Sequence, residues 1–330
     1  MSLTAADWLA VFAPKLAEPL FASAIVRHLR GLAEVLPGEC QGILEVRLAP
    51  EAAQVDLSLR VLAAQAAALA ARFPDSPTGR FLSSWSEPQG PLAPVRSVWL
   101  EFDLDREELA DPVVCAKLPA GIDPGWLLDT LLPALQGDPL SRSQRDLIAT
   151  CLDILPGSAH LLYVFSLRTR GSDAVRLEVF GMEPSQILEY LRRVAPRTVP
   201  EVREITPCFE GVERLHLSLD VGEEIRPRIG IEGSFPRQPR REPRWQELLG
   251  RLASRGLCAA EKRTAVLTWP GYDSFWTAPA AWPIAQRGAR GYCVRHLSHL
   301  KVACDPGGLT EAKAYLAFGP FERPATTAAS

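Results

Sequence analysis

The chain has 330 residues, of which 47% are hydrophobic and 23% charged, and its formal net charge is −3. This composition is typical of a soluble globular protein long enough for one large domain or two ordinary ones. The slight acidity argues against a general nucleic-acid-binding protein, because such binding depends on neutralising phosphates. No apolar run approaches the roughly 18 to 20 residues of a membrane span, so we expect no membrane partner.

Taken in chain order, one helical stretch is followed by two strands, and this pattern occurs five times. The expected helical stretches are 3–35, 62–73, 124–155, 184–194 and 244–255. The expected strand pairs are 43–48 with 55–61, 97–104 with 112–118, 161–167 with 174–180, 214–220 with 228–235, and 299–304 with 311–318. A polar loop that contains Trp85 is expected before residue 97. Ten consecutive antiparallel strands favour closure into one barrel, because closure removes exposed sheet edges.

The two faces of the strands indicate how this barrel is built. In strand 43–48, Leu44, Val46 and Leu48 share one face, and Glu45 and Arg47 share the other. The apolar face needs cover, which the amphipathic helices provide, so the helices should lie outside and the polar face should line the lumen. Other side chains expected in the lumen are Asp56, Glu178, His216 and Glu232. Ten strands enclose more space than the roughly eight that side chains alone can fill, so we expect a solvent-filled chamber.

The predicted fold class is therefore α+β, a ten-stranded antiparallel β-barrel with a polar lumen and an outer ring of helices. We expect residues 1–321 to form one domain and residues 322–330 to be a disordered tail. The alternative is an open sheet with one solvent-exposed face. The N-terminus has no basic segment followed by an apolar core, and the seven cysteines are scattered without a CxxC pair. These features predict a cytoplasmic protein with buried thiols.

The five helix-plus-hairpin units and Lys313-Ala-Tyr315 resemble the barrel of the aromatic prenyltransferases, the ABBA fold. The Lys-x-Tyr strand is similar to those with which the indole-type members hold a prenyl diphosphate. Arg176 and Arg228 match the family's cations on the second strands of hairpins. The resemblance implies a diphosphate site made of the following residues: Lys117, Arg176, Arg228, Lys301, Lys313 and Tyr315. A ring of cations stabilises the negative charge that develops on the leaving diphosphate.

Aromatic rings and a carboxylate would complete such a site. The rings expected to shield the allyl cation through cation–π attraction are Trp99, Tyr163, Phe165 and Phe180. Glu101 is the candidate base that removes the ring proton, with Asp103 as its alternate. An ion pair between Glu101 and Lys117 is an equally open interpretation. The sequence departs from the family in having only five tyrosines, so tryptophan and phenylalanine would have to replace some of the family's tyrosine shield.

The resemblance implies transfer of a prenyl group from a prenyl diphosphate to an aromatic small molecule or peptide side chain, by a chain acting as a monomer. No DDxxD-type acidic run is present and no metal site is predicted, although the requirement for Mg²⁺ is left open. A second hypothesis is a non-prenylating barrel that binds a peptide or a small anionic ligand, as an accessory protein of a biosynthetic pathway. The aromatic-rich segment 266–292 is interpreted either as a hydrophobic plug at one barrel mouth or as a lid or acceptor-binding wall.

Overall fold

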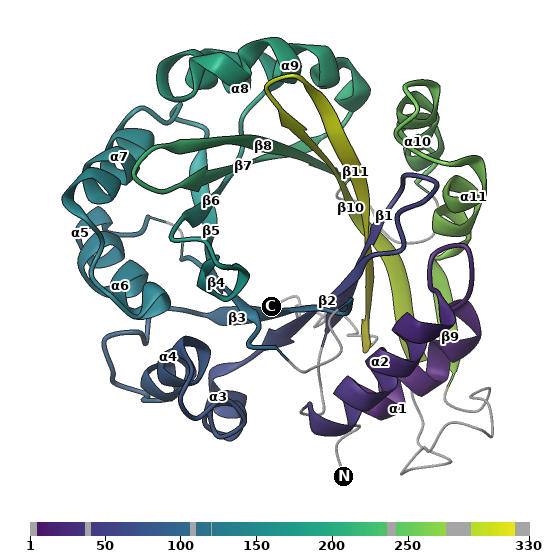
Figure 1. The fold of residues 1–330 in the computed structure, drawn as a ribbon, viewed down its shortest axis with the longest axis horizontal. Coiled ribbons are helices and arrows are strands. Elements are labelled where there is room, and N and C mark those ends of the chain that lie inside the picture. The colour runs from purple at the N-terminus through teal and green to yellow at the C-terminus, as the bar shows by residue number, and fades with distance from the viewer. Residues whose placement is uncertain are drawn as a thin grey trace, which may run out of the picture.

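A computed structural model describes residues 5–36, 41–105, 110–119, 121–235, 242–274 and 292–320 of the chain. In Figure 1 the strands form a ring, and the helices surround it. The predicted ten-stranded antiparallel barrel with an outer helical ring is therefore confirmed. The tail 322–330 and residues 275–291 of the aromatic-rich segment 266–292 lie outside the described residues.

The barrel is a meander in which each strand pairs with the next, until β11 returns to pair with β1 and closes the ring. β10 pairs with both β8 and β11, so every one of these ten strands has two neighbours. The ten strands are β1 (Gly42–Arg47), β2 (Val55–Val61), β3 (Ser97–Asp103), β4 (Val113–Lys117), β5 (His160–Ser166), β6 (Val175–Phe180), β7 (Arg214–Val221), β8 (Ile225–Ser234), β10 (Tyr292–Asp305) and β11 (Gly308–Pro320). A further strand that the sequence did not predict, β9 (Gly271–Ser274), pairs with the first residues of β10.

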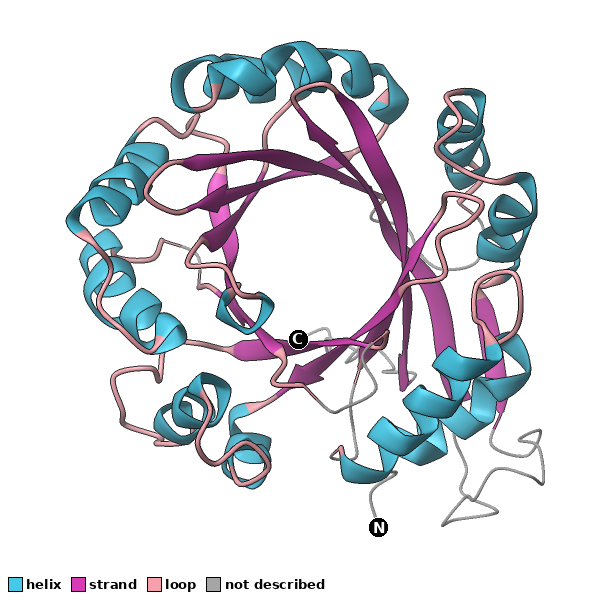
Figure 2. Cartoon of the chain, in the orientation of Figure 1, coloured by secondary structure: helices cyan, strands magenta, loops and turns pink. Residues whose placement is uncertain are grey.

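Helices cover the outside of the barrel (Figure 2). Their order around the barrel follows the chain, as the labels in Figure 1 show. They are α1 (Ala5–Phe12), α2 (Ser23–Val35), α3 (Ala63–Ala70), α4 (Pro77–Trp85), α5 (Pro124–Trp126), α6 (Leu132–Gln136), α7 (Arg142–Asp153), α8 (Pro184–Val194), α9 (Val199–Ile205), α10 (Arg244–Ser254) and α11 (Ala260–Thr268). A π-helical turn, Leu127–Leu131, joins α5 to α6. Within the described ranges, every helix is too short or too polar to cross a bilayer.

The hydrophobic core lies between the barrel and these helices. Leu44, Leu100, Leu177 and Leu316 point away from the lumen and are completely buried. Burying a leucine side chain contributes about 1.5–3 kcal/mol, so the outer face of the sheet is the main source of stability. The lumen face is consequently free to carry charge. Trp269, from the predicted aromatic segment, belongs to this outer core, where its ring packs edge-on against Phe12.

Local sequence signals account for the helix boundaries. Ser141 begins α7, and its hydroxyl accepts a hydrogen bond from the Gln144 N–H at 3.1 Å. Gly256 follows α10 with φ of 73°, which confirms the predicted helix stop. The predicted polar loop around Trp85 is wrong, because α4 occupies that stretch. Its start carries both a Ser76 cap and a proline at the first helical position, and Trp85 is buried.

Candidate functional site

The barrel encloses a cavity of about 480 Å³ in its lumen. Of the residues that the sequence predicted for the site, eight line this cavity: Trp99, Glu101, Tyr163, Phe165, Arg176, Phe180, Lys301 and Tyr315. The other four predicted residues, Asp103, Lys117, Arg228 and Lys313, are not among its lining residues. Ligand cavities in proteins commonly measure about 300–1,000 Å³, so this one has the volume of a small-molecule site.

Strand register places three cations side by side on the lumen wall. Lys313 of β11 lies directly opposite Lys301 of β10 on one side and opposite Arg47 of β1 on the other. Directly opposed residues in a sheet share a face, and their Cβ atoms are roughly 4.5–5.5 Å apart. We call Arg47, Lys301 and Lys313 the cation row. Arg47 was expected to face the lumen, but its place beside the two lysines depends on a pairing that the sequence did not reveal.

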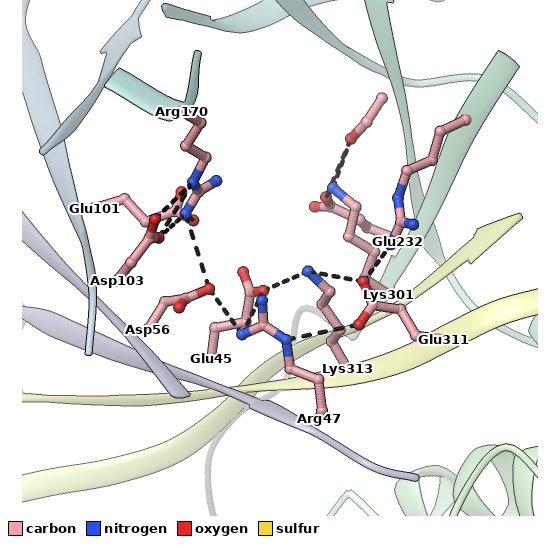
Figure 3. A network of polar contacts seen from close by, with 12 residues as sticks. Glu45, Arg47, Asp56, Glu101, Asp103, Arg170, Glu232, Lys301, Glu311 and Lys313 are labelled. Carbon is pink, nitrogen blue, oxygen red and sulfur yellow. Dashed lines mark hydrogen bonds and ion pairs between the residues drawn. The ribbon is translucent and has the colours of Figure 1, made fainter. Parts of the chain in front are cut away.

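Carboxylates neutralise the cation row from both sides, as Figure 3 shows. The Lys313 ammonium donates a hydrogen bond to Glu45 at 2.7 Å, and Arg47 donates one to Asp56 at the same distance. Glu311 approaches both Lys313 and Arg47, at 3.2 and 3.6 Å. Lys313 and Arg47 are therefore held in ion pairs with Glu45 and Glu311, and Arg47 is also hydrogen-bonded to the Asp56 carboxyl group.

Lys301 is more deeply buried than Lys313. Its ammonium donates hydrogen bonds to Glu232 at 2.6 Å and to the Ser218 hydroxyl at 3.0 Å. The side chain crosses over Gly230, where an added Cβ would lie only 2.5 Å from the lysine Cε. Gly230 is therefore needed for the close approach of this lysine side chain to the strand.

Arg170 joins the two candidate bases, and sequence reasoning missed it. It belongs to the helical turn Arg168–Arg170 between β5 and β6 and donates hydrogen bonds to Glu101 at 2.6 Å and to Asp103. Glu101 therefore pairs with Arg170, while Lys117 lies 6.0 Å from the centre of the Tyr163 ring. Strand alternation could not have found Arg170, because residues in a turn have no fixed face.

The two remaining predicted cations are also paired. The Arg176 guanidinium donates to both oxygens of Asp220, at 2.7 and 3.0 Å, and lies 5.9 Å from the centre of the Phe165 ring. Arg228 pairs with Glu311, and its side chain is 39% exposed. Arg176 and Lys301 thus line the cavity, and Lys313 lies opposite Lys301 without lining it. Arg228 also does not line the cavity and is partly exposed.

Burial and pairing together set the protonation of the lumen carboxylates. Burial alone would raise the pKa of Glu45, but Lys313 and Arg47 hold that pKa well below its usual range. The pKa of Glu232 is likewise lowered, because Lys301 outweighs its burial. Burial and the nearby Glu45 raise the pKa of Asp56 to about 8. At neutral pH, Glu45 and Glu232 are thus anions, whereas Asp56 holds a proton.

Aromatic and imidazole rings line the rest of the cavity. The Tyr315 ring stacks on His299 with 3.8 Å between centroids, and burial lowers the pKa of His299 to about 4, so this imidazole is neutral. Phe180 contacts His216 edge-on, with 4.9 Å between centroids. These rings offer polarisable faces next to the cation row.

Two groups of side chains in the described part of the lumen have the spacing of metal ligands. One contains Glu45, Asp56 and Glu101, and cations from Arg47 and Arg170 already contact it. The other contains Glu178, His216 and Glu232, and Lys301 contacts it at 2.6 Å. A metal ion entering either group would have to displace a built-in cation, so the donor sets do not fit a resident metal such as Mg²⁺.

Solved structures provide the relevant comparison for this barrel. The prenyltransferase PriB, in a ternary complex with L-tryptophan and dimethylallyl thiolodiphosphate, superposes with a TM-score of 0.54 at 12% identity, over 96% of both chains. The chain has the prenyltransferase-barrel fold. AnaPT from Neosartorya fischeri superposes on it with a TM-score of 0.53 at 10% identity, over 96% of this chain and 91% of AnaPT. No family model and no curated protein sequence matches the chain, so the likeness between these prenyltransferase barrels lies in their fold.

Proposed function

We propose that this prenyltransferase barrel transfers a prenyl group from an allylic diphosphate to an electron-rich aromatic acceptor. The observation that carries the proposal is the lumen cavity, where Arg176 and Lys301 line the same 480 Å³ as six phenylalanine, tyrosine and tryptophan side chains. Cations and aromatic faces within one enclosed space match the two needs of the reaction. The first is to stabilise a leaving diphosphate, and the second is to stabilise an allyl cation.

In this proposal the diphosphate binds to the cation row and the acceptor ring lies among the aromatic residues. Lys301 and Lys313 face each other across β10 and β11, so two neighbouring phosphate oxygens can contact both ammonium groups. The bond between the allylic carbon and oxygen breaks, and its electrons leave with the diphosphate. Trp99, Tyr163 and Phe165 line the cavity where the resulting cation would form.

A diphosphate can bind to the cation row only if one of the carboxylates paired with the row moves away. Glu311 contacts Arg47, Lys313 and Arg228, and its side chain is 22% exposed. It is the carboxylate most easily released to solvent, whereas Glu45 and Glu232 are buried. We therefore assign Glu311 as the anion that a diphosphate replaces on the row.

A second function is favoured by the same ion pairs. Arg176, Lys301 and Lys313 each have a carboxylate partner within 2.7 Å, so the lumen is close to electrically balanced without any ligand. A non-prenylating barrel that binds a peptide or a small ligand, as an accessory protein of a biosynthetic pathway, would need no free cations. Under this alternative the ion pairs stay closed when the ligand binds.

The two functions differ in what the purified protein does with prenyl diphosphates. Dimethylallyl and geranyl diphosphate are incubated in turn with tryptophan, tyrosine and a tryptophan-containing peptide, with and without Mg²⁺, and products are detected by mass. Prenyl transfer predicts an acceptor heavier by one prenyl group, and loss of that product in Lys301→Met. Lack of both product and calorimetric binding for either diphosphate would rule out transfer. Lys15→Met, at an exposed position outside the barrel, is the matched control.

A further inference from the structure

Glu178 of β6 stands apart from the other lumen carboxylates. Its Oε1 is 2.7 Å from Nδ1 of His216 on β7, and within the described ranges this imidazole is its one hydrogen-bonding partner. Both side chains line the cavity. By contrast, Glu101 is held by Arg170, Glu45 by Lys313 and Glu232 by Lys301. Glu178 is therefore the cavity carboxylate that neither an arginine nor a lysine occupies.

The surroundings of Glu178 suit a proton acceptor for an aromatic ring. Glu178 lies directly opposite Tyr163 across β5 and β6, and Arg176 lies two residues earlier on the same face. The edge-on contact between Phe180 and His216 completes this wall of the cavity. The carboxylate thus lies among the rings expected to hold the acceptor, next to the cation that faces Phe165.

We infer that Glu178 removes the ring proton after prenyl transfer and that His216 positions its carboxylate. This inference rests on the proposed function, and it moves the base from Glu101, the residue that the sequence favoured, to Glu178. A carboxylate already paired with a guanidinium is a weak base, because the cation stabilises the anion.

A π-electron pair of the acceptor ring forms the new bond to the allylic carbon, which leaves the ring positively charged and still carrying its hydrogen. The Glu178 carboxylate takes that hydrogen as a proton, and the C–H bond electrons restore the aromatic ring. The diphosphate has already left with the electrons of the C–O bond. His216 Nδ1 stays hydrogen-bonded to Oε1, so the other oxygen is available to accept the proton.

Electrostatics support this geometry. Burial and repulsion from Glu232 raise the pKa of Glu178, against the opposing effect of His216. Burial opposes the protonation of His216, but the hydrogen bond that its Nδ1 donates to Glu178 outweighs burial and raises the pKa of His216. A carboxylate whose pKa lies nearer to neutral pH is a better general base, and a positioned base contributes about 100- to 10,000-fold in rate. The groups facing this pair from the neighbouring strands are Tyr163, Ser218, Glu232 and Lys301.

The test compares Glu178→Gln with Glu101→Gln, using dimethylallyl diphosphate and ring-deuterated tryptophan, tyrosine and tryptophan-containing peptide. In Glu178→Gln we expect prenylated product to fall by roughly 100-fold or more, while diphosphate is still released as water captures the allyl cation. The residual product should show a larger isotope effect at the reacting carbon than the wild type. His216→Asn should shift the pH–rate profile. Glu189→Gln, at an exposed position on α8, is the control.

The outcomes separate this inference from the proposed function. A wild-type protein that forms no product overturns the proposed function and the inference together. A wild-type protein that forms product, with a Glu178→Gln variant that matches it in rate and isotope effect, overturns the inference alone. A loss of product with a raised isotope effect in Glu101→Gln instead would return the role of base to Glu101.

Discussion

Lys301 and Glu232 form a buried ion pair in the lumen, and we expect substitution of either partner to destabilise the fold. Both residues are at least 93% buried, and the ammonium–carboxylate distance is 2.6 Å. Lys301→Met leaves Glu232 as a buried anion whose remaining close partners are the Ser218 hydroxyl and a neutral His299. Breaking one side of a buried pair costs about 3–5 kcal/mol, so we expect a loss of that size in the free energy of unfolding.

A double-mutant cycle measures this coupling. Lys301→Met, Glu232→Gln and the double variant are unfolded in urea and followed by tryptophan fluorescence, with the exposed Lys15→Met as control. The double variant should be more stable than the sum of the two single losses predicts, by about 2 kcal/mol or more. The cost of Lys301→Met should shrink at pH 5, because Glu232 without its lysine can take up a proton. Additive losses, unchanged between pH 5 and pH 8, would refute the reasoning.

Three further predictions concern stability, and urea unfolding checks each of them. Lys262 donates to the carbonyls of Arg47, Ala49 and Ala52, so Lys262→Met should cost about 3 kcal/mol by leaving them unsatisfied; a loss below 1 kcal/mol would contradict this. At Gly42 a Cβ would lie 2.2 Å from the Phe318 ring, so Gly42→Ala should cost about 1–3 kcal/mol, whereas the exposed helical Gly31→Ala should not destabilise. Because burial and Glu45 raise the pKa of Asp56 to about 8, the native state keeps a proton that the unfolded chain releases near pH 4, and stability should fall as pH rises from about 4 to about 8. Asp56→Asn should remove that slope; an unchanged slope would contradict the assignment.

The fold was predictable because the strands alternate strictly between apolar and polar residues. Leu44, Val46 and Leu48 could face only a helical cover, which left Glu45 and Arg47 for the lumen. The helix α4 was missed because it has few apolar positions, although Ser76 followed by Pro77 is a recognisable helix-start signal. Strand β9 is four residues long and lies in a segment without alternation.

The site was predictable in composition but not in pairing. Alternation put Lys301, Lys313 and Glu232 on the lumen face, yet it cannot say which residues oppose one another across strands. That register decides which cations are neutralised, and it is fixed only when the barrel closes through β10, β11 and β1. Arg170 was beyond prediction for another reason. It reaches the lumen from a turn, and its long side chain places the guanidinium beside Glu101.

We propose above all that the lumen holds a prenyl diphosphate on the cation row. The most direct measurement is a crystal structure of the protein soaked with dimethylallyl thiolodiphosphate. We expect diphosphate oxygens within hydrogen-bonding distance of Lys301 and Lys313, with Glu311 turned away and the allyl chain pointing toward Trp99 and Tyr163. A lumen without the analogue at saturating concentration, with Lys313 still paired to Glu45 and Glu311, would contradict it.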